Sequence, residues 1–310
     1  MTPAPGRQEL VAYARDSIAR GSKSFALASR LFDRKTRENV WLLYAWCRRC
    51  DDIADGQEGG GTLTATADAP ARLAFLREQT ARAFTGAPVD DPAFACLGLV
   101  AHETGLTPAM AEAVIEGFAL DAADWTPRSE AELMRYCWHV AGAVGVMMAV
   151  VMGVRPDEEA VLDRACDLGL AFQLANIARD LMEDDAGARC YLPAQWLADA
   201  DIPPGEQLRP CYRDRLVPLA RRLCDLSEAY EASARFGAFA LPPRARWAVL
   251  AVAGSDGAIA RLVRAREGAA WDRRAVTTTA SKLAHVARSC FARRPADPGR
   301  EGLWTRPRES

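Results

Sequence analysis

The sequence has few histidines, no long apolar run and no recognisable nucleotide-binding loop. Its three histidines lie far apart, at His102, His139 and His285. The single CxxC, at Cys47 and Cys50, has no second copy, so a zinc or redox site is not indicated. The longest uncharged stretch, about 15 residues at 140–154, is shorter than the roughly 20 residues that a spanning helix needs. Without a Walker A or GxGxxG loop, a nucleotide site is not expected either.

A strong net charge is also lacking. The 310 residues carry a net charge of −2, with a pI near 6.0. This balance gives no electrostatic case for a nucleic-acid partner. Nine cysteines form an odd set without the short-chain framework of a secreted domain, which favours a reducing cytoplasm. We therefore expect a cytoplasmic protein that is soluble or lies on a membrane surface.

The composition that is present favours helices. Apolar residues make up 50% of the chain, Ala, Leu and Arg abound, and runs of β-branched residues are scarce. Helical periodicity predicts an all-α, single-domain fold over residues 1–292. The Arg- and Pro-rich tail at 293–310 is predicted to be disordered. The predicted helices cover about 8–20, 36–54, 71–85, 92–104, 107–122, 130–153, 157–184, 212–236, 243–267 and 278–292.

Two acidic clusters carry most of the functional information. They lie in CRRCDDIAD and NIARDLMEDD, and their aspartates are Asp51, Asp52, Asp55, Asp180, Asp184 and Asp185. Carboxylates at i and i+4 place like charges on one helix face, at a cost of about 0.2–0.5 kcal/mol per pair. Mg²⁺ offsets such repulsion, because it binds a few carboxylates and leaves its other positions to water and phosphate oxygens. Either cluster alone is more often a solvated face, but both together predict a metal-dependent diphosphate enzyme.

Polar residues extend both clusters along their helices. One stripe contains Tyr44, Arg48, Asp51, Asp52 and Asp55, and the other contains Gln173, Asn176, Asp180 and Asp184. Diphosphate binding needs cations and hydrogen-bond donors beside the metal ions. Arg48 and Arg179 lie close to the acidic clusters, and Ser22, Lys23 and Ser24 precede Phe25 in a predicted turn. These residues are candidate diphosphate ligands.

A run of small residues marks a third feature. Following Tyr136, it comprises Ala141, Gly142, Ala143, Gly145 and Ala149, interspersed with Val144, Met147 and Met148. Such a run allows two helices to pack closely, or it leaves room for a long hydrocarbon. The nearby acidic helices favour the second interpretation, which is the wall of an apolar tunnel.

These motifs resemble the trans-isoprenyl diphosphate synthases of the squalene and phytoene synthase group, and in particular its bacterial, carotenoid-forming branch. The resemblance spans nearly the whole chain. It is carried by GSKSF (21–25), YAWCRRCDDIAD (44–55), RYCWHVAGAVG (135–145), LGLAFQLANIARD (168–180), CYLPAQWL (190–197) and AWDRRAVTTTASKL (270–283). It implies an isoprenoid-synthase helical bundle with a central active-site cavity.

The resemblance also implies roles for individual residues. The metal ligands would be Asp51, Asp55, Asn176, Asp180 and Asp184. The four aspartates, with Tyr136 and Arg48, would form the catalytic set. The substrate-binding residues would be Ser22, Lys23, Ser24, Phe25, Tyr44, Gln173, Asn176, Arg179, Tyr191, Arg274 and Lys282. The chain departs from the family pattern at SDGAI (255–259), where a Tyr is usual, and at Ala188, where a Gly is usual.

The implied reaction joins two geranylgeranyl diphosphates head to head. Mg²⁺ or Mn²⁺ would assist loss of diphosphate, a cyclopropyl intermediate would form, and proton loss without NADPH would give phytoene. The implied partners are a membrane surface that takes up the product and the next desaturase of the carotenoid pathway. Three alternatives remain open: a dehydrosqualene- or squalene-type synthase that uses farnesyl diphosphate, another prenyl synthase or cyclase, and a non-catalytic lipid-binding assembly factor.

Overall fold

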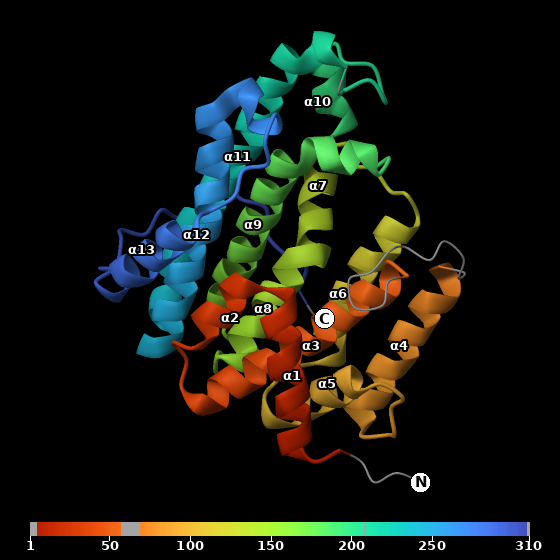
Figure 1. Ribbon diagram of the computed structural model, residues 1–310, viewed down its shortest axis with the longest axis vertical. Coiled ribbons are helices and arrows are strands. Elements are labelled where there is room, and N and C mark those ends of the chain that lie inside the picture. Colours follow the sequence, from red (N-terminus) through yellow and green to blue (C-terminus); the bar gives the residue numbers. More distant parts are fainter. Residues whose placement is uncertain (1–4, 57–68, 208, 309–310) are drawn as a thin grey trace.

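The computed structural model describes residues 5–56, 69–207 and 209–308, and every regular element in these ranges is a helix (Figure 1). The all-α prediction is confirmed. The helices are α1 (Arg7–Gly21), α2 (Lys23–Ser29), α3 (Arg34–Ala54), α4 (Ala69–Thr85), α5 (Pro92–Glu103), α6 (Pro108–Ala122), α7 (Glu130–Cys137), η1 (Trp138–Gly142), α8 (Ala143–Val151), α9 (Glu159–Ala186), α10 (Ala194–Asp199), η2 (Pro210–Tyr212), α11 (Arg213–Gly237), η3 (Ala238–Ala240), α12 (Pro243–Arg266), η4 (Glu267–Trp271) and α13 (Thr279–Cys290).

Polar caps and prolines fix several helix starts. The Asp33 carboxylate accepts a hydrogen bond from the backbone N–H of Thr36 and so caps α3, which contains the first acidic cluster. The Ser22 side chain accepts from the N–H of Phe25 at 3.3 Å and caps α2. The predicted turn at residues 21–24 is therefore wrong from Lys23 onward, because the Ser22 cap starts a short helix there.

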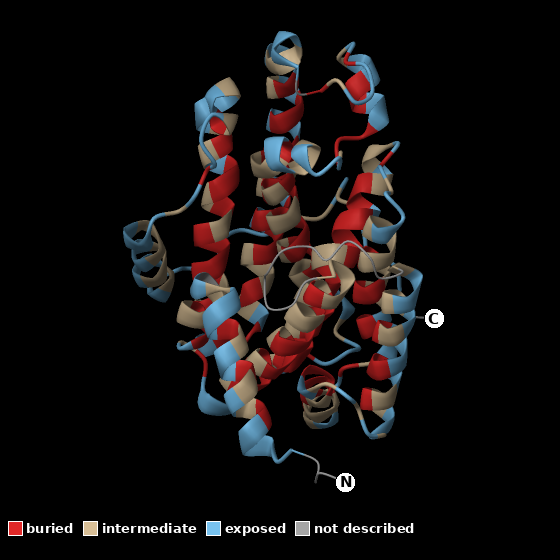
Figure 2. Ribbon diagram, turned by 45° about the vertical axis from the view of Figure 1, so that its right-hand side comes forward, coloured by how far each residue is buried: buried red, intermediate tan, exposed pale blue. Residues whose placement is uncertain are grey.

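The core is organised around α9. This 28-residue helix packs against α11, α8 and α12, and its buried face lies among the buried faces of its neighbours (Figure 2). Glycines let α8 and η1 approach it closely. A Cβ on Gly145 would lie 2.5 Å from the Ala165 carbonyl oxygen, and one on Gly169 would lie 2.3 Å from that of Ala141. The small residues thus do allow close helix packing.

Two helices that bear site residues are irregular. The predicted helix at 130–153 contains a π-helical turn at Trp138–Gly142, between α7 and α8. In α9, Asp180 has non-helical φ and ψ of −100° and 17°, which marks a kink within the second acidic cluster. Such π turns and kinks are frequent at functional sites.

Within the described residues, one helical stretch, Glu130–Val151, is long and apolar enough to cross a membrane, although the uncharged stretch that overlaps it, at 140–154, was too short to predict one. Of its most apolar window, 61% is buried inside the protein. The core helix of a soluble protein meets the same criteria of length and composition.

The predicted disorder of the tail is wrong for residues 293–308, which run along α9 and α11. Arg300, Arg306 and Arg308 form ion pairs with Asp163 of α9. The backbone N–H of Trp304 donates to the Tyr230 hydroxyl at 3.0 Å. The Arg-rich composition suggested a solvated segment, but its cations neutralise carboxylates that the fold buries.

Candidate active site

An apolar cavity of about 360 Å³ lies between α2, α3, α8, α9, α11 and α12. The predicted tunnel wall contributes Ala141, Val144, Gly145, Met148 and Ala149 to its lining, so this part of the interpretation is confirmed. The neighbouring Gly142, Ala143 and Met147 do not line the cavity and pack in the core instead. The end of the lining nearest the acidic clusters contains Tyr44, Gln173 and Asn176, which precede Asp51 or Asp180 by one or two helical turns.

The first acidic cluster ends α3, with Asp55 as its C-terminal cap. Arg48 donates to Asp51 at 2.9 Å and pairs with the buried Asp52 at 2.6 Å. Burial, followed by the charge of Asp55, raises the pKa of Asp51 to about 6, although Arg48 opposes the shift. Arg48 is therefore shared between two carboxylates and does not fully compensate the charge of Asp51.

The second acidic cluster lies at the kinked end of α9. Asp180 accepts two hydrogen bonds from Arg274, both of 2.9 Å, and also pairs with Arg179. Burial alone would raise the pKa of Asp180, but the two arginines hold it below its usual value. Burial, followed by the charge of Asp180, raises the pKa of Asp184 to about 7. Asp184 is thus the less compensated carboxylate of the two.

Arg189 connects the two clusters. Its Nη2 lies 4.0 Å from Oδ1 of Asp55, and its backbone N–H donates to the Asp184 carbonyl oxygen at 2.8 Å. The preceding residue, Ala188, has a φ of 57°, a left-handed conformation that explains why glycine is usual there. This turn directs the chain after α9 back toward α3. Arg189 is not among the site residues predicted from the sequence.

Asp121 of α6 is a second residue that the sequence did not reveal. Its carboxylate accepts hydrogen bonds from the hydroxyls of Tyr136 at 2.9 Å and Tyr191 at 3.1 Å. The two tyrosine rings stack at 4.8 Å, and Trp125 stacks on Tyr136 at 5.6 Å. Burial raises the pKa of Asp121 above its usual value and that of Tyr191 to about 12. Burial also raises the pKa of Tyr136 well above its usual value, so both hydroxyls stay protonated and able to donate.

The remaining predicted substrate ligands are less closely grouped. Phe25 and Tyr44 line the cavity with ring centroids 6.4 Å apart. Ser22 is engaged as a helix cap, Lys23 is exposed, and the Ser24 side chain is outside the described part of the structure. Lys282 lies beside Ser255 in a small hollow between α2, α12 and α13.

The acidic clusters fit Mg²⁺ or Mn²⁺ by the chemistry of their donors. Among the described residues, no three His, Cys, Asp or Glu side chains are already grouped as a protein cage for a metal ion. Mg²⁺ does not need such a cage, because it is usually bound through one or two carboxylates together with water and substrate phosphates. Asp51, Asp55 and Asp184 offer these hard oxygen donors near the polar end of the cavity.

Comparison with known proteins identifies the family to which this chain belongs. The family model described as Squalene/phytoene synthase matches residues 18–282. A phytoene synthase of Pseudescherichia vulneris is 47% identical over 307 residues, covering 96% of this chain and 98% of that protein. A 15-cis-phytoene synthase of Pantoea ananas is 44% identical over 309 residues, with the same coverage of each. The chain therefore belongs to the squalene/phytoene synthase family.

A solved structure supports the fold assignment. The crystal structure of a dehydrosqualene synthase in complex with ligand matches this fold with a TM-score of 0.80 at 26% identity. The match covers 91% of this chain and 96% of that chain. The predicted isoprenoid-synthase bundle is thereby confirmed.

Proposed function

We propose that this protein is a phytoene synthase, which condenses two geranylgeranyl diphosphates head to head and releases diphosphate. The observation that carries the proposal is the pairing of two acidic helix ends with the polar end of an apolar cavity. The near-full-length relatives named phytoene synthase support this substrate over farnesyl diphosphate.

The arginines of the site would bind the diphosphate groups. Arg274 and Arg48 present side chains that are 51% and 34% exposed, so both can reach a ligand as well as their aspartates. Arg189 adds a third cation between the clusters. A guanidinium binds phosphate oxygens through two parallel hydrogen bonds, which orients the leaving group.

A divalent cation completes the proposed site. Asp51, Asp55, Asn176, Asp180 and Asp184 would hold Mg²⁺ or Mn²⁺, whose chemical contribution is to neutralise charge on the leaving diphosphate. The apolar cavity would keep water away from the allylic cation that remains. The Tyr136 and Tyr191 hydroxyls, fixed by Asp121, lie near this carboxylate-rich end and would stabilise positive charge through their oxygen atoms.

One assay tests the proposal against its alternatives. The protein is incubated with geranylgeranyl or farnesyl diphosphate and Mg²⁺ or Mn²⁺, without NADPH, and the hydrocarbons are identified. We expect phytoene from geranylgeranyl diphosphate. A C30 product formed in preference would support the dehydrosqualene alternative, and no product with any metal would support a non-catalytic lipid-binding factor.

We further propose that the enzyme works in the cytoplasm at a membrane surface, because releasing an apolar product into water costs about 0.8 kcal/mol per CH₂ group. The Arg-rich tail is a poor candidate surface, since Arg300, Arg306 and Arg308 already pair with α9. The outer face of α13 suits an anionic membrane better. Its surroundings expose Val276, Leu283 and Phe291, with Arg273 and Arg288 nearby.

Vesicle binding tests this surface. Anionic vesicles should co-sediment the wild type and speed its turnover, and high salt should weaken both effects. The double variant Leu283→Glu/Phe291→Glu should lose binding, whereas the charge-matched Ala81→Glu/Thr85→Glu on α4 should keep it. Equal binding by both double variants would exclude the α13 face. The next desaturase of the pathway would meet the enzyme at the same membrane.

A further inference from the structure

Among the residues that the structure describes, Arg164 is the only charged residue that lines the cavity. The lining on α9 runs from Val161 to Asn176, so Arg164 lies about 18 Å along the helix from Asn176. Asn176 is close to the acidic cluster that begins at Asp180. Arg164 therefore occupies the end of the cavity that is distant from the proposed diphosphate site.

The Arg164 side chain is held from several sides. Its stem lies over Gly237, where a Cβ would approach the Cβ of Arg164 to 2.4 Å. Its guanidinium donates to the carbonyl and hydroxyl oxygens of Ser233, both at 3.3 Å, and lies 4.5 Å from the ring centroid of Phe236. Two further hydrogen bonds, of 2.8 and 3.0 Å, go to Asp297 of the C-terminal segment.

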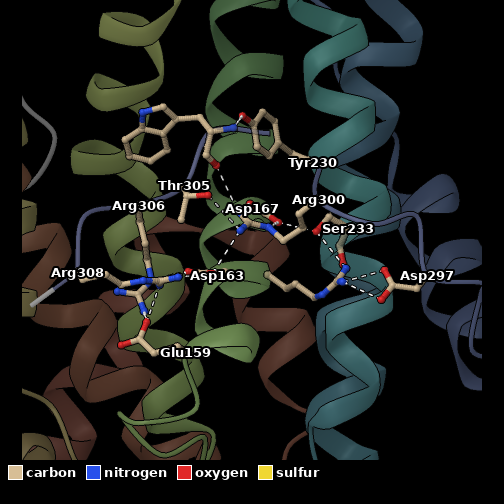
Figure 3. Close-up of polar contacts among 12 residues, drawn as sticks. Glu159, Asp163, Asp167, Tyr230, Ser233, Asp297, Arg300, Thr305, Arg306 and Arg308 are labelled. Carbon is tan, nitrogen blue, oxygen red and sulfur yellow. Dashed lines mark hydrogen bonds and ion pairs between the residues drawn. The ribbon is translucent and has the colours of Figure 1, made fainter. Parts of the chain in front are cut away.

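The C-terminal segment is itself bound to α9, which carries Arg164, and to α11, which carries Ser233 and Phe236 (Figure 3). Arg300 donates to both oxygens of the fully buried Asp167, at 2.9 and 2.8 Å, and Ser233 donates to Asp167 at 2.5 Å. Arg308 pairs with Asp163 and Glu159. Asp297 is therefore part of a C-terminal segment that is held in place by ion pairs, and it binds the Arg164 guanidinium from outside the cavity.

We propose that Arg164 is the end wall of the hydrocarbon cavity and sets the longest prenyl chain that the enzyme accepts, with Asp297 as its positioning residue. A chain that extends further would have to displace the Arg164 stem and pull its guanidinium from Ser233 and Asp297. This inference rests on the proposed function, because it names the residue that limits the substrate of that same site.

The test compares chain lengths rather than total activity. We would measure kcat/KM for farnesyl, geranylgeranyl and geranylfarnesyl diphosphate with the wild type, Arg164→Ala and Arg164→Met. In Arg164→Ala, the preference for geranylfarnesyl over geranylgeranyl diphosphate should rise about tenfold, since an apolar pocket discriminates by that order when it gains or loses small groups. Arg164→Met keeps most of the stem and should shift the preference by less.

Asp297 provides a second arm with a readout that a purely structural role would not move. Asp297→Ala should shift the chain-length preference in the same direction as Arg164→Ala, and Asp297→Glu should restore it. Arg155→Ala, on an exposed loop, serves as a surface control. An unchanged preference in a folded Arg164→Ala enzyme would overturn the proposal.

A binding series separates this inference from the proposed function. Titration calorimetry with the S-thiolodiphosphate analogues of the three chain lengths needs no turnover. The longest analogue should gain affinity in Arg164→Ala relative to the wild type. If the wild type turns over none of the diphosphates, the proposed function fails, while the binding series still decides the role of Arg164.

Discussion

Helix α9 carries acidic residues at both ends, and the two ends differ in how their charge is neutralised. At the N-terminal end, Glu159, Asp163 and Asp167 meet three arginines of the C-terminal segment. At the other end, Asp180 is paired with Arg179 and Arg274, but Asp184 forms no ion pair within the described chain. The same i, i+4 spacing therefore belongs to a structural cluster of ion pairs at one end and to a candidate catalytic site at the other. We call the structural cluster the clasp; it consists of Glu159, Asp163, Asp167, Arg300, Arg306 and Arg308.

The pKa directions of one carboxylate from each end, Asp163 and Asp184, express this difference. At Asp163, the charges and hydrogen bonds of Arg308, Arg300 and Arg306 outweigh burial and keep its pKa below the usual value. At Asp184, burial and the charge of Asp180 prevail and raise the pKa to about 7. Spacing alone thus does not separate a functional carboxylate from a structural one. Asp163 and Asp184 differ in the number of cations around them. The pKa direction alone does not assign a role either, because burial raises the pKa of the structural Asp167, whereas Arg179 and Arg274 hold that of Asp180, a proposed metal ligand, below its usual value.

The largest expected effect is on activity at the C-terminal end of α9. Asp184→Asn removes a proposed metal ligand, so kcat/KM should fall on the order of 10³-fold, equivalent to several kcal/mol of transition-state stabilisation. The melting temperature should not fall, because the change also removes like-charge repulsion with Asp180. Steady-state kinetics and calorimetry check both results. Near-normal turnover that still requires metal would remove Asp184 from the site.

The clasp should show the opposite behaviour. Asp167→Asn removes the fully buried charge that Arg300 neutralises and should lower the free energy of unfolding by about 3 kcal/mol, since breaking a buried ion pair is strongly destabilising. Turnover with geranylgeranyl diphosphate per folded molecule should change little at a temperature where the variant is folded. Urea unfolding and active-site-normalised kinetics give the two values. A stable but inactive variant would contradict the comparison.

Arginine replacements at the two ends sharpen the contrast. Arg274→Lys keeps the charge but loses the paired hydrogen bonds to Asp180 and to diphosphate, so kcat/KM should fall about tenfold. The matched change Arg300→Lys should lower the melting temperature and leave kcat/KM for geranylgeranyl diphosphate nearly unchanged. If both variants lose activity equally, the arginines at the two ends do not have separate roles.

Periodicity and local motifs made most of the fold and part of the site predictable. The i, i+4 aspartates of α3 and α9 and the small residues of α8 are local patterns, and the structure has them on helices around one cavity. Asp121 was missed because its one carboxylate neighbour at helical spacing, Asp124, lies beyond the end of α6 in a left-handed conformation, with a φ of 50°, so no acidic stripe continues there. Its partners Tyr136 and Tyr191 are 15 and 70 residues away.

The clasp was missed for the same reason. Its arginines meet α9 across more than 130 residues, as Arg300 and Asp167 do, and composition alone suggested a disordered tail. Glu159, Asp163 and Asp167 do have visible i, i+4 spacing. What the sequence could not supply was the tertiary contact that neutralises them, because such pairings depend on where the folded chain returns.

The smallest expected effect is on the pH dependence of stability, measured in a metal chelator. The folded-state pKa of Asp184, about 7, exceeds its ordinary value of 3.8. Its contribution to stability is therefore complete below pH 4 and is lost as the pH rises toward 7, by about 1 kcal/mol after allowance for solvent screening. Between pH 5 and pH 8, the wild type should lose stability relative to Asp184→Asn. Asp163 has a lowered pKa and is ionised in both states across this range, so Asp163→Asn should show a constant deficit. Urea unfolding at both pH values measures the differences, and parallel behaviour of the wild type and Asp184→Asn would show that Asp184 is as well compensated as Asp163.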